Sequence, residues 1–192
     1  ENFNPYDARY RDETIEFESP DVAHVFRTFQ GWTALTEQGP NDGTLQLIPI
    51  AKGMSYVLTR ALLDDVPENE LCGSKAGKAL SINDKYHSLL LEGLISIPKM
   101  NPGDTIWWHP DVVHAVEEKH QGKNYSNVIY VGATPYCKKN IDYIKKQSKK
   151  FIEGKSPPDF APEDYEVNYK GRVKVNDLSE LAKKQLGLID WN

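Results

Sequence analysis

Two of the five histidines, His109 and His114, stand five residues apart, and Asp111 lies between them in the segment GDTIWWHPDVVHAVEE. Imidazole nitrogens and a carboxylate oxygen make up the two-histidine, one-carboxylate set that holds iron(II) and leaves coordination positions open. A neutral imidazole is also a frequent metal ligand in general. We therefore take His114 as the candidate metal ligand, with His109 and Asp111 as secondary candidates.

The local sequence places these residues on two short strands that are separated by a break. Trp107 and Trp108 belong to the first strand, Pro110 interrupts it, and the second strand holds His114, so the two strands can lie side by side. Adjacent strand residues point to opposite faces, so at most one of the tryptophans shares a face with the histidines. A histidine on such a strand is also compatible with a purely structural role, and His109 and Asp111 are compatible with turn residues or with partners that orient an imidazole.

Further strands are predicted where β-branched and aromatic residues alternate between turn signals. The predicted strand segments are 22–36, 44–50, 94–100, 104–110, 112–118 and 126–135. The first two are expected to form a hairpin. Strands at such close spacing indicate antiparallel pairing in a sandwich or jelly roll.

Helical periodicity appears in three places. Apolar residues recur at helical spacing over 53–63 and over 138–151, and a short helix near the C-terminus has Asp177 and Glu180 at capping-box spacing. The expected fold is mainly β with flanking helices (α+β), and residues 1–192 are expected to be a single domain or the C-terminal part of one. It comprises an irregular lead-in (1–20), a jelly-roll core (21–136) and a helical, proline-rich extension (137–192).

Composition excludes several classes of partner. The net charge of −5 offers no basic face for nucleic acid, and the one lysine cluster lies on the predicted helix 138–151, as its solvated face. No apolar run is long enough to cross a membrane. Cys72 and Cys137 fit neither a disulfide framework nor a zinc site, which indicates a reducing compartment and a cytoplasmic location. The first residue is Glu1 rather than Met, so we expect the chain to be part of a longer one.

Three stretches of the sequence resemble the YbiU-like family, known as a domain of unknown function. They are VFRTFQGWTALTEQGPNDGTLQLIPIAKGM, ISIPKMNPGDTIWWHPDVVHAVEEKHQGKNYSNVIYVGATP and FIEGKSPPDFAPEDYEVNY. More distantly, the chain resembles iron(II)/2-oxoglutarate oxygenases of the phytanoyl-CoA-hydroxylase type. That resemblance implies a double-stranded β-helix of cupin-like architecture, iron(II) and 2-oxoglutarate as cofactors, and hydroxylation of a small-molecule substrate, with His114 as the late iron ligand.

Two departures from the oxygenase pattern qualify this expectation. The His-x-Asp or His-x-Glu pair of the oxygenases has no counterpart upstream of Trp32, since Val25 and Phe26 follow His24. The missing ligands are therefore expected in an N-terminal region outside this chain, which would also be a docking partner. The alternatives are a metal-free jelly-roll module that binds a ligand or partner, and a structural fragment that is stable only when docked on that region.

The second departure concerns the arginine that holds 2-oxoglutarate in the oxygenases. Tyr125 and Ser126 stand at the corresponding place, so Lys123, Arg27 and Ser126 are the candidates for binding this cosubstrate. Trp32 and Trp108 are candidates for the mouth of the substrate pocket, although large aromatic residues on strands also commonly fill the core.

Overall fold

The computed structural model describes residues 2–9, 11–14, 24–75, 78–158 and 164–191. The chain divides into two compact units. The first is built from Glu1–Ala8, Arg27–Lys75 and Leu80–Thr134, and it holds all of the described strands. The second, which includes Pro135–Asn192, holds the C-terminal helices. Of the predicted lead-in (1–20) and the predicted strand 22–36, residues 1, 10 and 15–23 lie outside the described residues.

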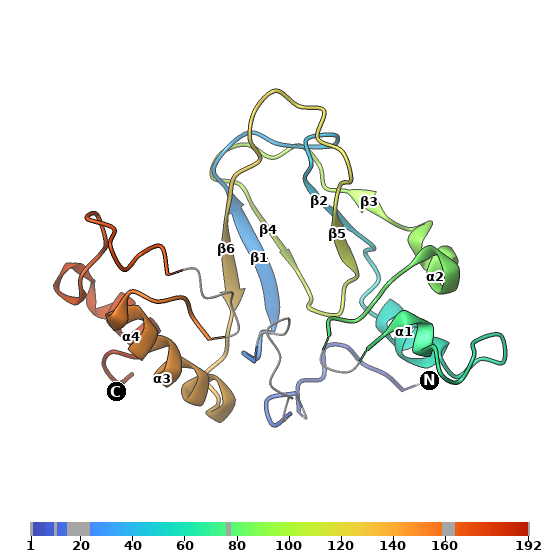
Figure 1. Ribbon diagram of the computed structural model, residues 1–192, viewed down its shortest axis with the longest axis horizontal. Helices are drawn as coiled ribbons and strands as arrows, with labels where there is room; N and C mark the ends of the chain where they lie inside the picture. Colours follow the sequence, from blue (N-terminus) through green and yellow to red (C-terminus); the bar gives the residue numbers. More distant parts are fainter. Residues whose placement is uncertain (1, 10, 15–23, 76–77, 159–163, 192) are drawn as a thin grey trace. The chain divides into compact units, whose positions relative to one another are not determined.

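One three-stranded sheet has the order β4-β1-β6 (Figure 1). Strand β1 (Phe29–Ala34) lies between β4 (Thr105–Trp108) and β6 (Val128–Ala133), and both pairings are antiparallel. The alternation of β1 turns Trp32 and Ala34 to the core. Gly31 faces the other way, and the ring of Trp107 lies over it: a Cβ at this glycine would come within 2.7 Å of the ring.

The second sheet has the order β3-β2-β5 (Figure 1). Strand β2 (Leu45–Leu47) is central, with β3 (Ile95–Ser96) and β5 (His114–Val116) as its antiparallel neighbours. The antiparallel pairing expected from the sequence is therefore confirmed for every strand of the described residues. The architecture is a mixed α+β fold with two small antiparallel sheets.

The hairpin expected of the first two strands is wrong, because β1 and β2 lie in different sheets. Strands β4 and β5 also lie in different sheets, so the side-by-side arrangement that the sequence allowed around Pro110 is not adopted. Each strand has one apolar face, and a strand buries that face equally well beside its sequence neighbour or in the opposite sheet. Periodicity thus locates the strands but does not determine their partners.

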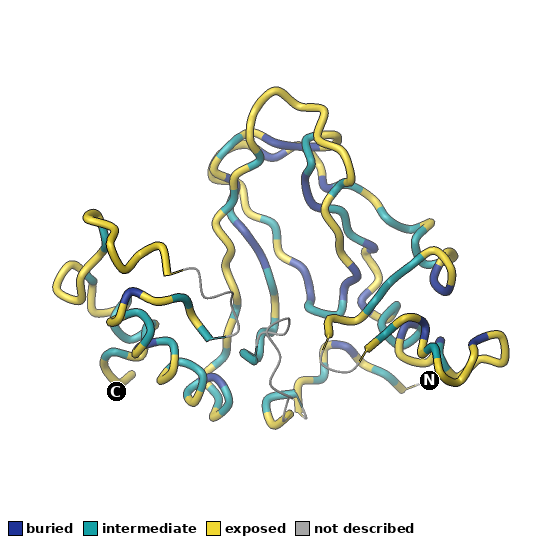
Figure 2. Tube along the Cα trace, in the orientation of Figure 1, coloured by how far each residue is buried: buried dark blue, intermediate teal, exposed yellow. Residues whose placement is uncertain are grey.

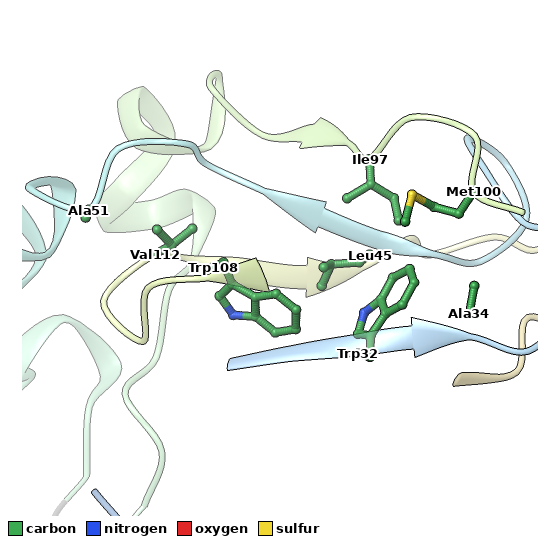
Figure 3. Close-up of a cluster of buried hydrophobic side chains, with 8 residues drawn as sticks. All are labelled: Trp32, Ala34, Leu45, Ala51, Ile97, Met100, Trp108 and Val112. Carbon is green, nitrogen blue, oxygen red and sulfur yellow. The ribbon is translucent and has the colours of Figure 1, made fainter. Parts of the chain in front are cut away.

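The main hydrophobic core lies between the two sheets. In Figure 3, side chains from both sheets fill the space between the strands. The buried members of this cluster are Trp32, Ala34, Leu45, Ala51, Ile97, Met100, Trp108 and Val112. Because the cluster draws on β1, β4 and β2 together, the two sheets form opposed layers around one core within the first unit.

Two helices belong to the same unit. Helix α1 (Gly53–Arg60) is shorter than the predicted segment 53–63. Its buried residues are Val57 and Arg60, whereas Leu62, beyond its end, is 80% exposed, so the apolar residues after Arg60 do not extend the packed face. Helix α2 (Asp84–Leu91) is not among the predicted helices, and the side chain of Asn83 caps it by accepting a hydrogen bond from the Tyr86 N–H. A short 3₁₀ turn (Leu71–Gly73) precedes it.

The second unit contains α3 and α4. Helix α3 (Lys138–Glu153) confirms the predicted amphipathic helix, and it ends at Gly154, whose φ of 72° is left-handed. Helix α4 (Glu180–Gln185) is capped by Ser179, whose hydroxyl accepts from the Ala182 N–H, and not by Asp177, which ends a 3₁₀ turn (Val175–Asp177). Among the helices of the described residues, none has the length and apolar character needed to cross a membrane.

Candidate metal site at the start of strand β5

His114 is the first residue of β5, and the pairing of this strand decides which way its side chain points. His114 lies opposite Leu47, and Val116 lies opposite Leu45, which is buried in the core between the sheets. Directly opposed residues of an antiparallel pair share a face of the sheet. The His114 side chain therefore belongs to the inner face, where its ring lies 5.5 Å from that of Trp108, between ring centroids.

The protonation pattern of His114 follows from its hydrogen bond. Its Nδ1 lies 3.0 Å from the backbone carbonyl oxygen of Val112. Because a carbonyl only accepts, Nδ1 carries a hydrogen, and in the neutral ring Nε2 then carries the lone pair. A backbone carbonyl that holds one ring nitrogen in this way is a typical partner of a metal-ligating histidine. The imidazole is thus oriented so that the Nε2 lone pair is available to a cation.

The two candidate mouth residues, Trp32 and Trp108, are both buried. Trp32 is 3% exposed and Trp108 5%, and both belong to the core cluster, so Trp32 packs as a core residue. Trp108 also contacts the His114 ring, and its indole Nε1 is buried without a hydrogen-bond partner in the described part of the chain. Trp107, by contrast, is 46% exposed on the other face, as expected for adjacent strand residues.

His109 and Asp111 form a local turn next to the site. The Asp111 N–H donates to His109 Nδ1 over 3.1 Å, which requires that nitrogen to be unprotonated. The Asp111 carboxylate is 3.9 Å from the same nitrogen, and an ion pair there would need the protonated ring. The hydrogen bond from the Asp111 N–H is shorter, so it indicates that His109 Nδ1 is unprotonated. The His109 ring packs edge-on against Tyr6 and Phe29.

The three residues do not converge as a local metal triad. Within the described ranges, no group of three histidine, cysteine, aspartate or glutamate side chains is arranged to hold a metal ion. His109, Asp111 and His114 all lie in these ranges, so they do not form such a group. Their spacing across Pro110 explains why, since His109 is fixed by its turn before the chain enters β5.

Arg27 is the cosubstrate candidate that lies on the inner face. Its Nη1 donates to the Gln30 side-chain oxygen over 3.0 Å, and Gln30 lies opposite Trp108 in the first sheet. The aliphatic part of Arg27 passes Gly132 of β6, where a Cβ would sit 3.4 Å from the arginine Cδ. The guanidinium therefore lies on the inner face of the first sheet, which is opposed to the second sheet that carries His114.

Lys123 and Ser126 lie elsewhere. Both belong to the connection between β5 and β6, which leaves β5 at the end opposite His114. The Ser126 hydroxyl donates to the Asp42 backbone carbonyl over 2.6 Å, and Lys123 is exposed. The structure thus brings the rings of His114 and Trp108 together across the two inner faces and places Arg27 on the inner face of the first sheet, while Ser126 has a structural bond that tethers this connection.

One buried histidine is missed by pattern reasoning. His87 in α2 is 1% exposed, accepts a hydrogen bond at Nδ1 from the Asn83 N–H over 3.2 Å, and has no partner for Nε2 among the described residues. Burial lowers the pKa of His87 below its ordinary 6.5, and the positive charge of Arg60 acts in the same direction. Its helical segment gives no sign of this, because the burial depends on packing against α1.

This pKa shift predicts an acid-sensitive stability. The unfolded state binds the His87 proton at higher pH than the folded state does, so stability falls as the pH drops below 6.5. Below about pH 6.5, urea unfolding should show a progressive loss of stability, with a limiting slope of about 1.4 kcal/mol per pH unit for one proton. His87→Gln should flatten the dependence, while His120→Gln, at an exposed histidine, should leave it unchanged. An unaltered slope in His87→Gln would contradict the assignment.

Comparison with known proteins identifies a family and a long relative that match this chain. A family profile described as Gig2-like matches residues 1–188. YbiU of Escherichia coli (strain K12) is 45% identical over 188 residues, which are 97% of this chain but 45% of YbiU. The chain thus spans less than half of that relative.

Two solved structures have the same fold over nearly all of this chain. A protein named "Putative Oxidoreductase from Salmonella typhimurium LT2" matches with a TM-score of 0.86 and 44% identity, over 95% of this chain and 44% of its own. GlcNAc Inducible Gene 2 protein of Candida albicans matches with a TM-score of 0.84 and 27% identity, over 100% of this chain and 46% of its own. The arrangement of the two sheets and their helices is therefore shared with much longer proteins.

Proposed function

The chain belongs to the Gig2-like family, as its resemblance to YbiU indicated, and from this premise we propose that it carries part of the active site of an iron(II)- and 2-oxoglutarate-dependent oxygenase. The substrate would be a small organic molecule, and the reaction its hydroxylation. The name of the Salmonella relative supports the broader class, oxidoreductase. Support for the finer statement comes from the strand order and from His114.

The strand order supports a double-stranded β-helix. Along the chain, β1 lies in the first sheet, β2 and β3 in the second, β4 in the first, β5 in the second and β6 in the first. Jelly rolls pass strands between two opposed antiparallel sheets in this manner. The apolar inner faces of both sheets meet in one core, which is the other requirement of that architecture.

The single observation that carries the proposal is the fixed orientation of His114. Its Nδ1 is held by the Val112 carbonyl, so its Nε2 can donate to a cation from the inner face of β5. Imidazole suits iron(II), and the remaining histidine and carboxylate would come from polypeptide outside the described residues. A bound iron(II) would supply the oxygen activation that hydroxylates the substrate while 2-oxoglutarate is decarboxylated.

The other residues of this face have roles that follow from their contacts. Trp108 packs against the His114 ring and excludes water from one side of it. Arg27 offers a planar pair of donors for a carboxylate of 2-oxoglutarate, and its bond to Gln30 limits where the guanidinium can move. These roles are part of the proposal, and the inner-face contacts of the two side chains support them.

An anaerobic iron(II) titration tests the proposal. We would use the 192-residue chain and a YbiU hybrid, defined as YbiU in which these residues replace the segment that they match. We expect the hybrid to develop a visible metal-to-ligand charge-transfer band only when iron(II) and 2-oxoglutarate are both present. A folded hybrid that binds neither would contradict the enzyme assignment and leave a metal-free binding module.

A further inference from the structure

We propose that the outer edges of β5 and β6 form a docking surface for two more β-strands, supplied by polypeptide of the same protein outside these 192 residues. We call the inward-facing residues of these two strands the open edge. They are His114, Val116, Val128, Tyr130 and Gly132. The proposal concerns assembly of the fold and is independent of whether iron binds.

One side of the β6 backbone is not paired with any other strand of the described residues. The Leu35 N–H donates to the Asn127 carbonyl over 2.9 Å, and the register then pairs Thr33 with Ile129. Because backbone groups alternate along a strand, the odd-numbered residues of β6 bond to β1. The N–H and C=O groups of Val128, Tyr130 and Gly132 therefore point away from β1, where no strand of the described residues lies.

Strand β5 repeats this arrangement in the second sheet. The Glu117 N–H donates to the Thr44 carbonyl over 2.9 Å, and the Ile48 N–H donates to the Val113 carbonyl over 2.9 Å. By the same alternation, the backbone groups of His114 and Val116 point away from β2. β5 and β6 are thus end strands of their sheets, each with an unpaired row of donors and acceptors.

The side chains of the open edge are exposed residues that lie directly opposite buried core residues on the same face. Tyr130 lies opposite Trp32 on the same face, yet Tyr130 is 76% exposed while Trp32 is 3% exposed. Val116 lies opposite Leu45, and these two are 65% and 8% exposed. Figure 2 shows β6 largely exposed beside β1, which is buried in its middle, and β5 largely exposed in the second sheet. At Tyr130 and Val116 the inner face therefore continues past the core with little cover from the described residues.

The composition of β6 is that of an interior strand. Its sequence, VIYVGA, contains no charged residue and no proline, which are the devices that normally protect an edge against pairing. The other edge strands differ: β3 has only two residues, and β4 is followed after one residue by Pro110. Strand β6 has six residues, long enough to accept a full neighbouring strand.

The occupant is inferred from the length of the relatives and the position of the core. Over half of YbiU lies outside the segment that this chain matches. Tyr130 lies opposite Trp32, and Val116 lies opposite Leu45. Trp32 and Leu45 belong to one core cluster. One continuous partner that places a strand on each edge, with apolar residues at alternate positions, would cover both sites together.

Backbone hydrogen exchange measures this docking directly, without metal. In the 192-residue chain, the amides of Val116, Val128, Tyr130 and Gly132 should exchange rapidly. In the YbiU hybrid, they should slow by at least about tenfold, as ladder amides do. Equal exchange in both proteins would overturn the proposal. Slow exchange in the 192-residue chain that depends on its concentration would also overturn it, in favour of pairing between two copies.

A matched pair of substitutions provides a second route. Tyr130→Lys places a charge on the inner face, whereas Ile129→Lys places one on the outer face of the same strand, at a residue that is 54% exposed. Both should be tolerated in the 192-residue chain. In the hybrid, Tyr130→Lys should lower the thermal midpoint by several degrees and restore rapid exchange, and Ile129→Lys should do neither. Equal effects of the two substitutions in the hybrid would contradict the docking surface.

Discussion

Replacing His114 by alanine in the YbiU hybrid should weaken iron(II) binding by on the order of 100-fold or more. Loss of a residue that only supports a ligand already costs about 10- to 100-fold in metal affinity, so loss of the ligand itself should reach or exceed the upper end. The expectation rests on His114 Nε2, which the bond between Nδ1 and the Val112 carbonyl leaves as the donor nitrogen.

The measurement is the iron(II) titration in the presence of 2-oxoglutarate, followed by the charge-transfer band. His120→Ala is the matched control, because this exposed histidine lies in the connection after β5 and not on its inner face. The control should bind iron as the unaltered hybrid does. Equal loss in both variants, or no loss in His114→Ala, would mean that the metal is held elsewhere.

Replacing Trp32 by alanine should lower the free energy of unfolding of the 192-residue chain by about 3–5 kcal/mol, the usual cost of emptying a buried aromatic site. Trp32 is 3% exposed and belongs to the cluster that both sheets share. Its removal leaves a cavity between the layers, which the central strand β1 cannot close without disturbing both of its neighbours.

Urea unfolding of Trp32→Ala beside Trp107→Ala tests this assignment of the two faces. Trp107 is 46% exposed and lies over Gly31 on the outer face, so its replacement should cost less than about 1.5 kcal/mol. Similar losses for the two variants would show that the outer face is covered as fully as the inner one. A small loss for Trp32→Ala would contradict the shared core.

The opposed orientation of Trp107 and Trp108 could be predicted from the sequence, because neighbouring strand residues point to opposite faces whatever the fold. The same holds for helix α3, whose periodicity and final glycine are local features. The buried His87 could not be predicted, since a helical segment does not reveal which neighbour covers it. Nor could Ser179 be chosen over Asp177 as the cap of α4, because both stand at plausible positions.

Within the candidate site, the sequence by itself determined that His114 stands on a short strand after a proline break, and its resemblance to YbiU determined the family. Only the tertiary structure decided that β5 pairs with β2 and not with β4, and this pairing turns His114 to the inner face. Likewise, the contact of the His114 ring with the Trp108 ring joins strands of different sheets, so it depends on which strands meet. The physical reason is that alternation is a local property, whereas strand partners are chosen by burial of the whole core.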